Sequence, residues 1–301
     1  MLELRNPRIA IPVVLFAGLL WSFGPLVVRY MDNPQLVPWQ YIFGRGLTIF
    51  ILLNLYLFFE EGKNFYKNYY KIGLSGVIGG AGLGIAMITF IYSITNTSAA
   101  VTLLCLAAMP FFTALLAFLF LREKISLNVW ISIIIASVGI IIMATGNTGE
   151  KSLIGFVFGL TSSIGFSVFS VTLRWRKETP KFTTVAFAGL FCLLFATTVI
   201  FIKDLTFFST SYNGSLFSLH GTLVCFGLIL YSIGSKAIPA AELTLLSLTE
   251  VIGGIFWVWL PILGINEVPS TNTIIGGFFL FVSIFYYSLI MRWNKRYIAL
   301  N

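Results

Sequence analysis

The stretch PAAELTLLSLTEVIGGIFWVWLP, residues 239–261, is long enough to cross a bilayer but contains two glutamates. A membrane-spanning helix needs about 20 mainly apolar residues, and a charge near its centre costs roughly 2.5–3.5 kcal/mol on insertion scales. Glu242 falls in the first turn after Pro239, where a carboxylate complements the positive end of a helix, so structural and functional roles are equally open for it. Glu250 falls near the middle, where a continuous helix has no free backbone donors. We predict that Glu250 binds cargo or takes part in coupling; the alternative is a neutral, hydrogen-bonded acid between packed helices.

The composition indicates a polytopic membrane protein. Of 301 residues, 58% are hydrophobic and only 10% are charged, and the mean hydropathy is +0.94. That leaves too few polar side chains to cover a soluble domain of this size. The net charge of +8 does not predict nucleic-acid binding, because the basic residues lie between apolar runs and not on one water-facing surface. We expect the lipid bilayer to be the partner of most of the surface.

Ten apolar runs predict an all-α fold with ten transmembrane helices. The polar stretch at residues 146–151 is rich in turn-forming residues and has five runs on either side. We therefore expect a five-helix repeat at residues 1–145, a linker at 146–151 and a second five-helix repeat at 152–301. The runs cover residues 9–30, 36–59, 70–94, 98–121, 127–144, 153–173, 183–203, 215–234, 239–263 and 272–292.

The distribution of Lys and Arg predicts that both termini are cytoplasmic. Cytoplasmic connections of membrane proteins carry an excess of these residues. With the N-terminus inside, fifteen of the 19 fall in cytoplasmic connections and one, Arg45, falls within a span. The opposite side holds only Arg29, Lys151 and Lys203. An odd number of spans would break this alternation.

The two halves resemble each other at their third and fourth spans. The tripeptide YSI at residues 92–94 is followed by Ala99-Ala100, and the same tripeptide at 231–233 is followed by Ala240-Ala241. Because each half has an odd number of spans, the two copies enter the membrane in opposite orientations. An inverted repeat of this kind favours alternating-access transport with a site near the membrane midplane.

Prolines and glycines inside the spans have two interpretations. Gly24-Pro25 in the first span and Pro110 in the fourth free backbone groups, so they can bend the helix, line a cavity or act as hinges. The glycines of the third span are expected to allow close helix packing. They are Gly76, Gly79, Gly80, Gly82 and Gly84.

Metal and hydrolase sites are not indicated. Cys105, Cys192 and Cys225 all lie in apolar runs without the close spacing of a zinc site, and they are expected to be small core residues. His220 is the single histidine, so neither a multi-histidine metal site nor most nucleophilic triads can be built.

With these features the sequence resembles the drug/metabolite transporter superfamily, in particular its EamA-type members. The resemblance covers nearly the whole chain and implies ten helices in two inverted five-helix repeats. It does not identify a cargo, since members with these motifs carry chemically different molecules. The chain departs from the pattern with Val251, where the family often has Pro, and with extra residues at 261–263. The matching motifs are WSFG at 21–24, FGR at 43–45, MPFFTALL at 109–116, REK at 122–124, Glu250-Val251, WVW at 257–259 and Glu267.

Candidate site residues follow from charge and aromatic character. Glu250 and Glu242 are the acidic candidates, and Arg45, about ten residues into its span, needs a carboxylate or carbonyl partner. We expect that partner to be a buried acid, with a structural ion pair and a role in binding or gating both open. Trp21, Tyr92, Tyr231 and Trp257 could present ring faces to a cation near Glu250.

The sequence therefore predicts a multi-pass secondary transporter of the cell's inner membrane. A cationic or zwitterionic metabolite, such as an amine, amino acid or osmolyte, is favoured as cargo, with a neutral amphipathic molecule next. A proton is a candidate coupling partner, because burial disfavours the charged form of a carboxyl group. No ATP-binding loop or other cofactor site is found. A channel and a membrane-embedded enzyme are the alternatives, and the single histidine argues against the enzyme.

Overall fold

The computed structural model describes residues 6–146, 153–176, 178–268 and 270–298, and its regular structure in these ranges is helical. Eight helical stretches in the described part are long and apolar enough to cross a membrane, and shorter apolar stretches lie at Leu127–Ile142 and Ile274–Tyr287. The chain is therefore an all-helical, multi-pass membrane protein. Most of the predicted linker, residues 147–151, lies outside the described residues.

The helices coincide with the ten apolar runs to within a few residues, except that the last one continues to Ile298. A π-helical turn at Ala117–Leu121 extends the seventh helix, and 3-10 turns lie at Gly62–Asn64 and Pro261–Leu263. The bounds are α1 Pro7–Trp21, α2 Gly24–Arg29, α3 Pro38–Glu61, α4 Lys67–Tyr70, α5 Gly73–Asn96, α6 Ala99–Leu106, α7 Met109–Leu116, α8 Leu127–Gly146, α9 Leu153–Trp175, α10 Lys181–Ile202, α11 Ser211–Gly234, α12 Ala240–Leu246, α13 Thr249–Trp259 and α14 Thr271–Ile298.

Three of the long apolar stretches are broken into two helices each. The breaks between α1 and α2 and between α6 and α7 come just before Pro25 and Pro110, which stand in the first turn of the second helix. Proline cannot donate a backbone hydrogen bond and its ring clashes with the carbonyl four residues before it, so the helix restarts there. The predicted bending at Gly24-Pro25 and Pro110 thus corresponds to helix breaks in the structure.

The third break, between α12 and α13, has no proline. Val251 lies two residues after the start of α13. Here Leu248 and Glu250 donate backbone hydrogen bonds to carbonyls three residues back, at 3.2 and 2.9 Å. The Ser247 hydroxyl likewise donates to the carbonyl of Thr244 at 2.8 Å. Such short-range bonds tighten the chain locally and end the first helix. The second half therefore breaks its helix without the proline of the family pattern.

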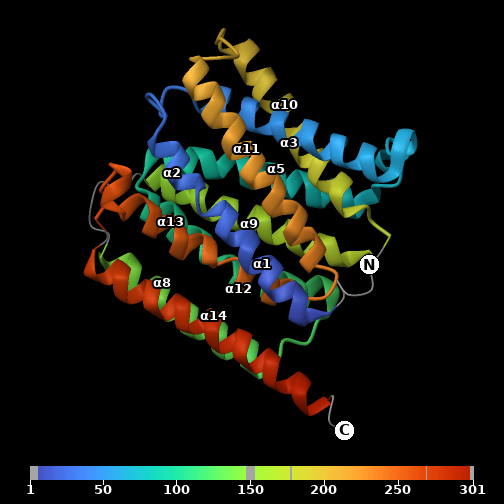
Figure 1. Ribbon diagram of the computed structural model, residues 1–301, viewed down its shortest axis with the longest axis vertical. Coiled ribbons are helices and arrows are strands. Elements are labelled where there is room, and N and C mark those ends of the chain that lie inside the picture. The colour runs from blue at the N-terminus through green and yellow to red at the C-terminus, as the bar shows by residue number, and fades with distance from the viewer. Residues whose placement is uncertain (1–5, 147–152, 177, 269, 299–301) are drawn as a thin grey trace.

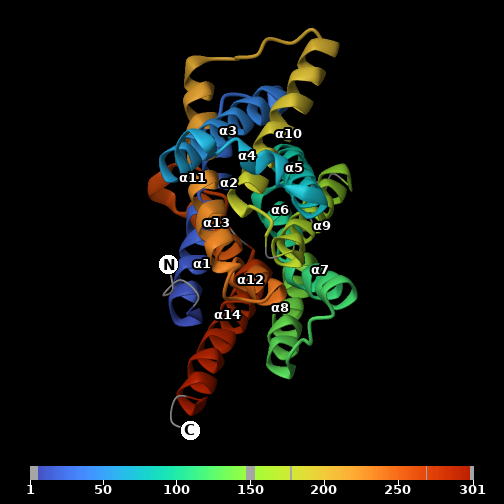
Figure 2. The ribbon, with the colours of Figure 1, turned by 90° about the vertical axis from the view of Figure 1, so that its right-hand side faces the viewer.

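The helices form a central group flanked by two pairs (Figures 1 and 2). α5 packs against α9 and α1 packs against α11 in the middle, with α3 and α10 paired on one side and α8 and α14 paired on the other. Glycine allows α5 and α9 to approach closely in the centre, as predicted for the third span. A Cβ on Gly165 of α9 would lie 2.6 Å from the carbonyl oxygen of Gly82 on α5, so neither helix could approach as closely with a larger residue.

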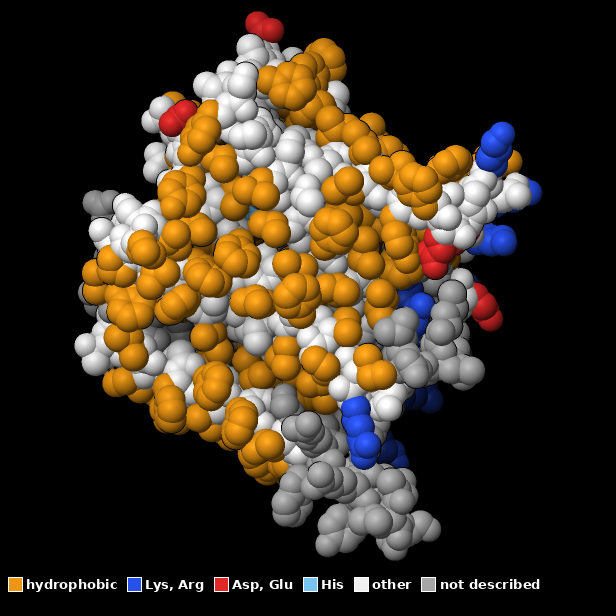
Figure 3. All heavy atoms as spheres, in the orientation of Figure 1, with side chains coloured by type: hydrophobic (Ala, Val, Ile, Leu, Met, Phe, Trp, Pro, Cys, Tyr) orange, Lys and Arg blue, Asp and Glu red, His pale blue; other side chains and the backbone are white. Residues whose placement is uncertain are grey.

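The surface matches a lipid environment. Large apolar side chains are exposed along the spans, including Phe16 at 52%, Phe118 at 61% and Phe278 at 64%. Figure 3 shows apolar side chains over most of this face, with Lys and Arg gathered along its right-hand edge. An apolar band bordered by charge is the surface expected of helices in a bilayer.

Candidate functional site

A cavity of about 60 Å³ lies between the two halves of the chain. Helices α1, α3, α5, α6 and α7 line it from the first half, and α9, α11 and α13 from the second. A cavity of this size has room for a few water molecules, so a larger cargo requires the walls to move apart. The polar side chains in its wall are Arg45, Ser162, His220 and Glu250, the aromatic rings are Trp21, Phe90 and Phe166, and the rest is aliphatic or thioether surface.

Glu250 reaches this cavity because the helix restarts just before it. The break places Glu250 in the first turn of α13, 9% exposed, and not in the middle of a continuous helix. The expectation of a mid-helix position is thus wrong, although the position remains central in the 239–261 stretch. The positive end of α13 is directed toward the carboxylate, which favours negative charge there. The backbone N–H of Glu250 is itself occupied by the carbonyl of Ser247.

The start of α7 meets the same cavity from the other half. Met109 is the first residue of α7 and lines the cavity, and it stands ten residues after Ala99, as Glu250 stands ten residues after Ala240. The two breaks thus bring two equivalent helix starts to one place. At this place the first half has the apolar thioether of Met109 and the second half has the carboxylate of Glu250. A helix start here therefore does not require an acidic residue.

Arg45 lies in the cavity wall without a carboxylate partner in contact. It is 2% exposed, and its Nη2 donates to the carbonyl oxygen of Met87 at 2.5 Å, while its Nε has no hydrogen-bond partner. Its guanidinium carbon lies 5.8 Å from the ring centre of Tyr41. Among the described residues, ion pairs within 4.0 Å join other arginines. A carbonyl oxygen therefore takes the place of the expected acidic partner. Glu250 and Arg45 line the same cavity without forming an ion pair.

His220 is a cavity residue that the sequence reasoning did not assign. It is 2% exposed, and its Nδ1 shares a hydrogen bond with the Tyr41 hydroxyl. A Cβ on Gly24 would lie 2.7 Å from its Nε2, so the glycine before Pro25 leaves room for the imidazole. The signal for this residue was present in the sequence, since a histidine inside an apolar span marks a polar interior.

Trp21 is the predicted aromatic residue that lines the cavity. Its Nε1 donates to the carbonyl of Val224 at 3.3 Å, which fixes the indole in the wall. Tyr231 lies behind it, with ring centres 5.4 Å apart, and shares a 2.7 Å hydrogen bond with Ser170. Phe166 packs against both of these rings. It lines the cavity in the place where we expected Tyr231.

Tyr92 and Trp257 lie outside the cavity wall. The ring of Tyr92 packs on Trp39 at 5.1 Å. The indole of Trp257 stacks on Phe23 at 4.7 Å and donates to the Ser22 hydroxyl at 2.9 Å, so it supports the break between α1 and α2. The four predicted rings therefore do not meet around one site.

Glu242 also lies away from the cavity. Its carboxylate accepts a hydrogen bond from the Tyr287 hydroxyl, which joins α12 to α14. Gly24, Pro25 and Pro110 lie at helix starts, two of them at the break between α1 and α2. Of the predicted acidic, basic and aromatic site residues, the structure brings Glu250, Arg45 and Trp21 together.

No group of three or more His, Cys, Asp or Glu residues in the described part of the chain could hold a metal ion. The three cysteines are buried and free. The chemistry of the cavity therefore comes from one carboxylate, one guanidinium, one imidazole and one hydroxyl among apolar walls.

Known proteins agree with this architecture. Residues 8–145 match the EamA-like transporter family. The chain is 26% identical over 252 residues to a protein named uncharacterized transporter from Helicobacter pylori strain J99, with 80% of each chain covered. The protein of the same name from strain 26695 is 25% identical over the same length and coverage. A solved crystal structure matches with a TM-score of 0.69 over 95% of this chain and 99% of its own, and its 15% identity shows a shared fold alone.

The resemblance drawn from the sequence motifs is thereby confirmed. The matched family covers the first five apolar runs, and the transporter-named relatives extend across most of the chain. Together with the apolar helices, these matches show a multi-pass membrane transporter whose residues 8–145 match the EamA-like transporter family.

Proposed function

We propose that this protein is a secondary transporter that moves a small zwitterionic metabolite, such as an amino acid, by alternating access. The observation that carries the proposal is the cavity between the two halves, which presents one carboxylate and one guanidinium from opposite halves of the chain. Glu250 would hold an ammonium group and Arg45 a carboxylate. Trp21, Phe90 and Phe166 would contact the apolar part of the cargo.

Charge balance favours a zwitterion over a simple amine. A lone cation bound at Glu250 would bring a second positive charge near the buried guanidinium of Arg45. A lone anion would meet Glu250 in the same way. A molecule with both charges neutralises each side chain in turn, which offsets the cost of keeping two charges in an apolar wall. A simple amine is the next candidate, with Glu250 alone as its anchor.

Helix contacts support two inverted five-helix repeats at residues 1–145 and 152–301. Exchanging the halves turns the α5–α9 contact into the α11–α1 contact, and the α3–α11 contact into the α10–α5 contact. The α3–α10 and α8–α14 pairs are each made of counterparts and map onto themselves. This exchange symmetry is the one expected for ten spans with a pseudo-two-fold axis in the membrane plane. In such folds one half rocks against the other around a central site.

The proposed location is the cell's inner membrane, with both termini in the cytoplasm and the linker at 146–151 outside. Lys and Arg gather on one edge of the structure, which supports this orientation (Figure 3). Protons are the proposed coupling ion. Glu250 is the cavity carboxylate, and a carboxyl group that exchanges a proton for the cargo ammonium has its negative charge neutralised in both states.

Counterflow in liposomes tests this function. Purified protein is reconstituted into vesicles loaded with an unlabelled panel compound, and uptake of the same radiolabelled compound is measured. The panel holds neutral amino acids, betaine, aliphatic amines and aliphatic carboxylates. We expect saturable counterflow of a zwitterion that exceeds the flux of the matched amine and carboxylate. Flux that rises without saturation would indicate a channel, and conversion of a panel compound into a product would indicate an enzyme; either outcome would overturn the proposal.

A further inference from the structure

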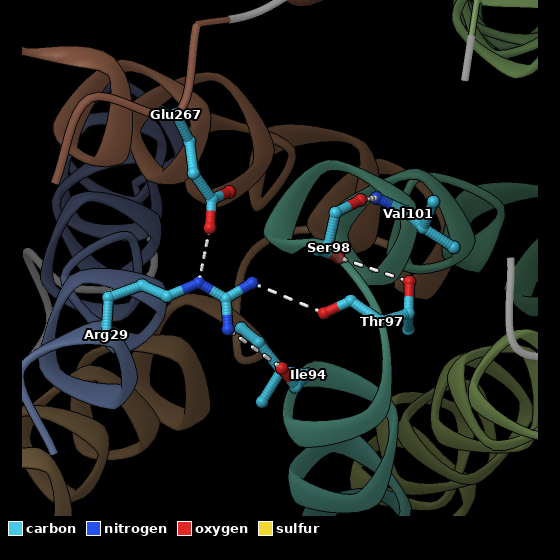
Figure 4. A network of polar contacts seen from close by, with 6 residues as sticks. All are labelled: Arg29, Ile94, Thr97, Ser98, Val101 and Glu267. Atoms are coloured by element: carbon cyan, nitrogen blue, oxygen red, sulfur yellow. Dashed lines mark hydrogen bonds and ion pairs between the residues drawn. The ribbon is translucent and has the colours of Figure 1, made fainter. Parts of the chain in front are cut away.

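Arg29, the last residue of α2, connects three segments at one end of the central helices (Figure 4). Its Nε forms an ion pair with Glu267 Oε1 at 2.5 Å. Its Nη1 and Nη2 donate to the carbonyl oxygens of Ile94 and Thr97, both at 3.2 Å. The two carbonyls belong to the end of α5 in the same half of the chain, whereas Glu267 follows α13 in the other half. The guanidinium thus ties the halves together.

Arg174, in the last turn of α9, makes the same set of contacts with the halves exchanged. Its Nε forms an ion pair with Glu123 Oε1 at 2.7 Å. Its Nη1 donates to the carbonyl oxygens of Ser235 and Ile238 at 3.2 and 2.9 Å. These carbonyls follow α11 in its own half, and Glu123 follows α7 in the first half.

The two glutamates are also presented by the same backbone device. Each follows a residue in the left-handed region, Arg122 with φ 53° and Asn266 with φ 53°. The N–H of Glu123 donates to the carbonyl of Ala117 at 3.3 Å, and that of Glu267 donates to the carbonyl of Val258 at 3.0 Å. The extra residues of the second half form the 3-10 turn Pro261–Leu263 and leave the contact in place. A non-glycine residue in the left-handed region is uncommon, so its recurrence at both sites indicates a shared geometry.

The two contacts lie at opposite ends of the molecule. α1 and α2 run away from the N-terminus (Figure 1), and Arg29 is the last residue of α2, so its contact lies at the far end of this segment. Arg174 lies in the last turn of α9, which packs against α5 and runs back toward the N-terminal end (Figure 1). The cavity is lined by residues of α5 and α9 that precede the two contacts along these helices, so it lies between the contacts, and its volume is about 60 Å³ with both contacts formed. Each glutamate is 23–34% exposed, so neither pair is sealed in the core.

We propose that these four side chains are the two gates of the transporter: Arg29–Glu267 closes the cavity on one side, Arg174–Glu123 closes it on the other, and they open one at a time. The inference rests on the proposed alternating-access function. When the halves separate at one end, the ion pair there breaks while the guanidinium keeps its carbonyl partners in its own half. The opposite pair stays closed and acts as the pivot. The structure, with both pairs formed, is the closed state between the two open ones.

Glu267→Gln and Glu123→Gln test the gates separately, since glutamine keeps the side-chain size and removes the ion pair. The reporter is Ser162→Cys in the cavity wall, in a chain whose native cysteines are replaced by alanine. A membrane-impermeant maleimide is added to right-side-out and to inside-out vesicles, and the labelling rates are compared. Glu178→Gln, an exposed carboxylate outside both pairs, is the matched control. Melting temperatures show whether each variant is folded. If the alanine background is unstable, the same labelling is measured in a chain that keeps its native cysteines, with and without Ser162→Cys.

We expect shifts of opposite sign. Glu267→Gln should increase labelling from the Arg29 side by about threefold or more and decrease it from the other side, as a partly exposed ion pair predicts. Glu123→Gln should do the reverse, and the control should match the parent. Equal labelling in all three, or a shift in the same direction for both gate variants, overturns the gates. The labelling assay needs no cargo, so its result is independent of the counterflow assay. Opposite labelling shifts without counterflow would contradict only the proposal that the cargo is a zwitterion. Counterflow without the labelling shifts would contradict only the proposal that the two ion pairs are gates.

Discussion

Arg45→Met separates a binding role from a structural one, because the structure predicts opposite effects on stability and transport. The substitution removes one hydrogen bond from a charged group to the Met87 carbonyl, worth about 1.5–3 kcal/mol, and a ring contact with Tyr41 worth roughly 1 kcal/mol. It also removes a buried guanidinium whose Nε is unpartnered, which relieves a desolvation cost of several kcal/mol. The energy lost with these two contacts is about as large as the desolvation cost that is relieved, so the free energy of unfolding should stay the same or rise.

Transport should respond strongly. If Arg45 holds the cargo carboxylate, its loss removes a charge-assisted interaction of about 1.5–3 kcal/mol, which corresponds to roughly a 10- to 150-fold loss of apparent affinity. The assay pairs thermal melting of the detergent-solubilised protein with counterflow of the zwitterion and of the matched amine. Amine flux should be retained or improved. A melt lowered by more than about 10 °C would show a structural arginine, and unchanged zwitterion counterflow would remove Arg45 from the site.

Three further outcomes follow from single positions. Gly24→Ala should lower the melting temperature, because a Cβ 2.7 Å from the His220 imidazole overpacks the site by about 1–3 kcal/mol; adding His220→Ala should restore much of the loss, and equal melts for both would contradict the contact. Glu242→Gln should cost about 1 kcal/mol of stability through its weakened bond to α14 while leaving cargo affinity unchanged, since it lies away from the cavity. A cysteine at Asn147 should react with an impermeant reagent in intact cells and one at Asn294 should not; the reverse labelling would invert the topology.

Much of the fold follows from the sequence because apolar run length is a strong constraint in a bilayer. The runs located every long helix, and proline located two of the three breaks. The break at Ser247-Leu248 was not predicted, since hydroxyl and short-range backbone bonds take the place of proline there. The helix start at Glu250 was missed for the same reason.

The candidate site was less accessible to sequence reasoning. Charge inside a span identified Glu250 and Arg45, because an intramembrane charge requires a polar interior. Aromatic residues carry no such constraint: Tyr231 and Phe166 are both ring-bearing residues, and only packing decides which one faces the cavity. The partners of Arg29 and Arg174 lie in opposite halves, so no local pattern reveals them.

Glu250→Gln tests the central claim most directly, since it removes the charge of the cavity carboxylate while keeping its volume. Parent and variant are reconstituted side by side, counterflow of the zwitterion is measured across external pH values, and melting temperature controls for folding. We predict a folded variant that has lost most zwitterion counterflow, because an amide neither pairs with an ammonium group nor exchanges a proton. Any residual flux should no longer depend on pH. Counterflow equal to the parent with an unchanged pH profile would contradict the account and exclude Glu250 from the transport mechanism.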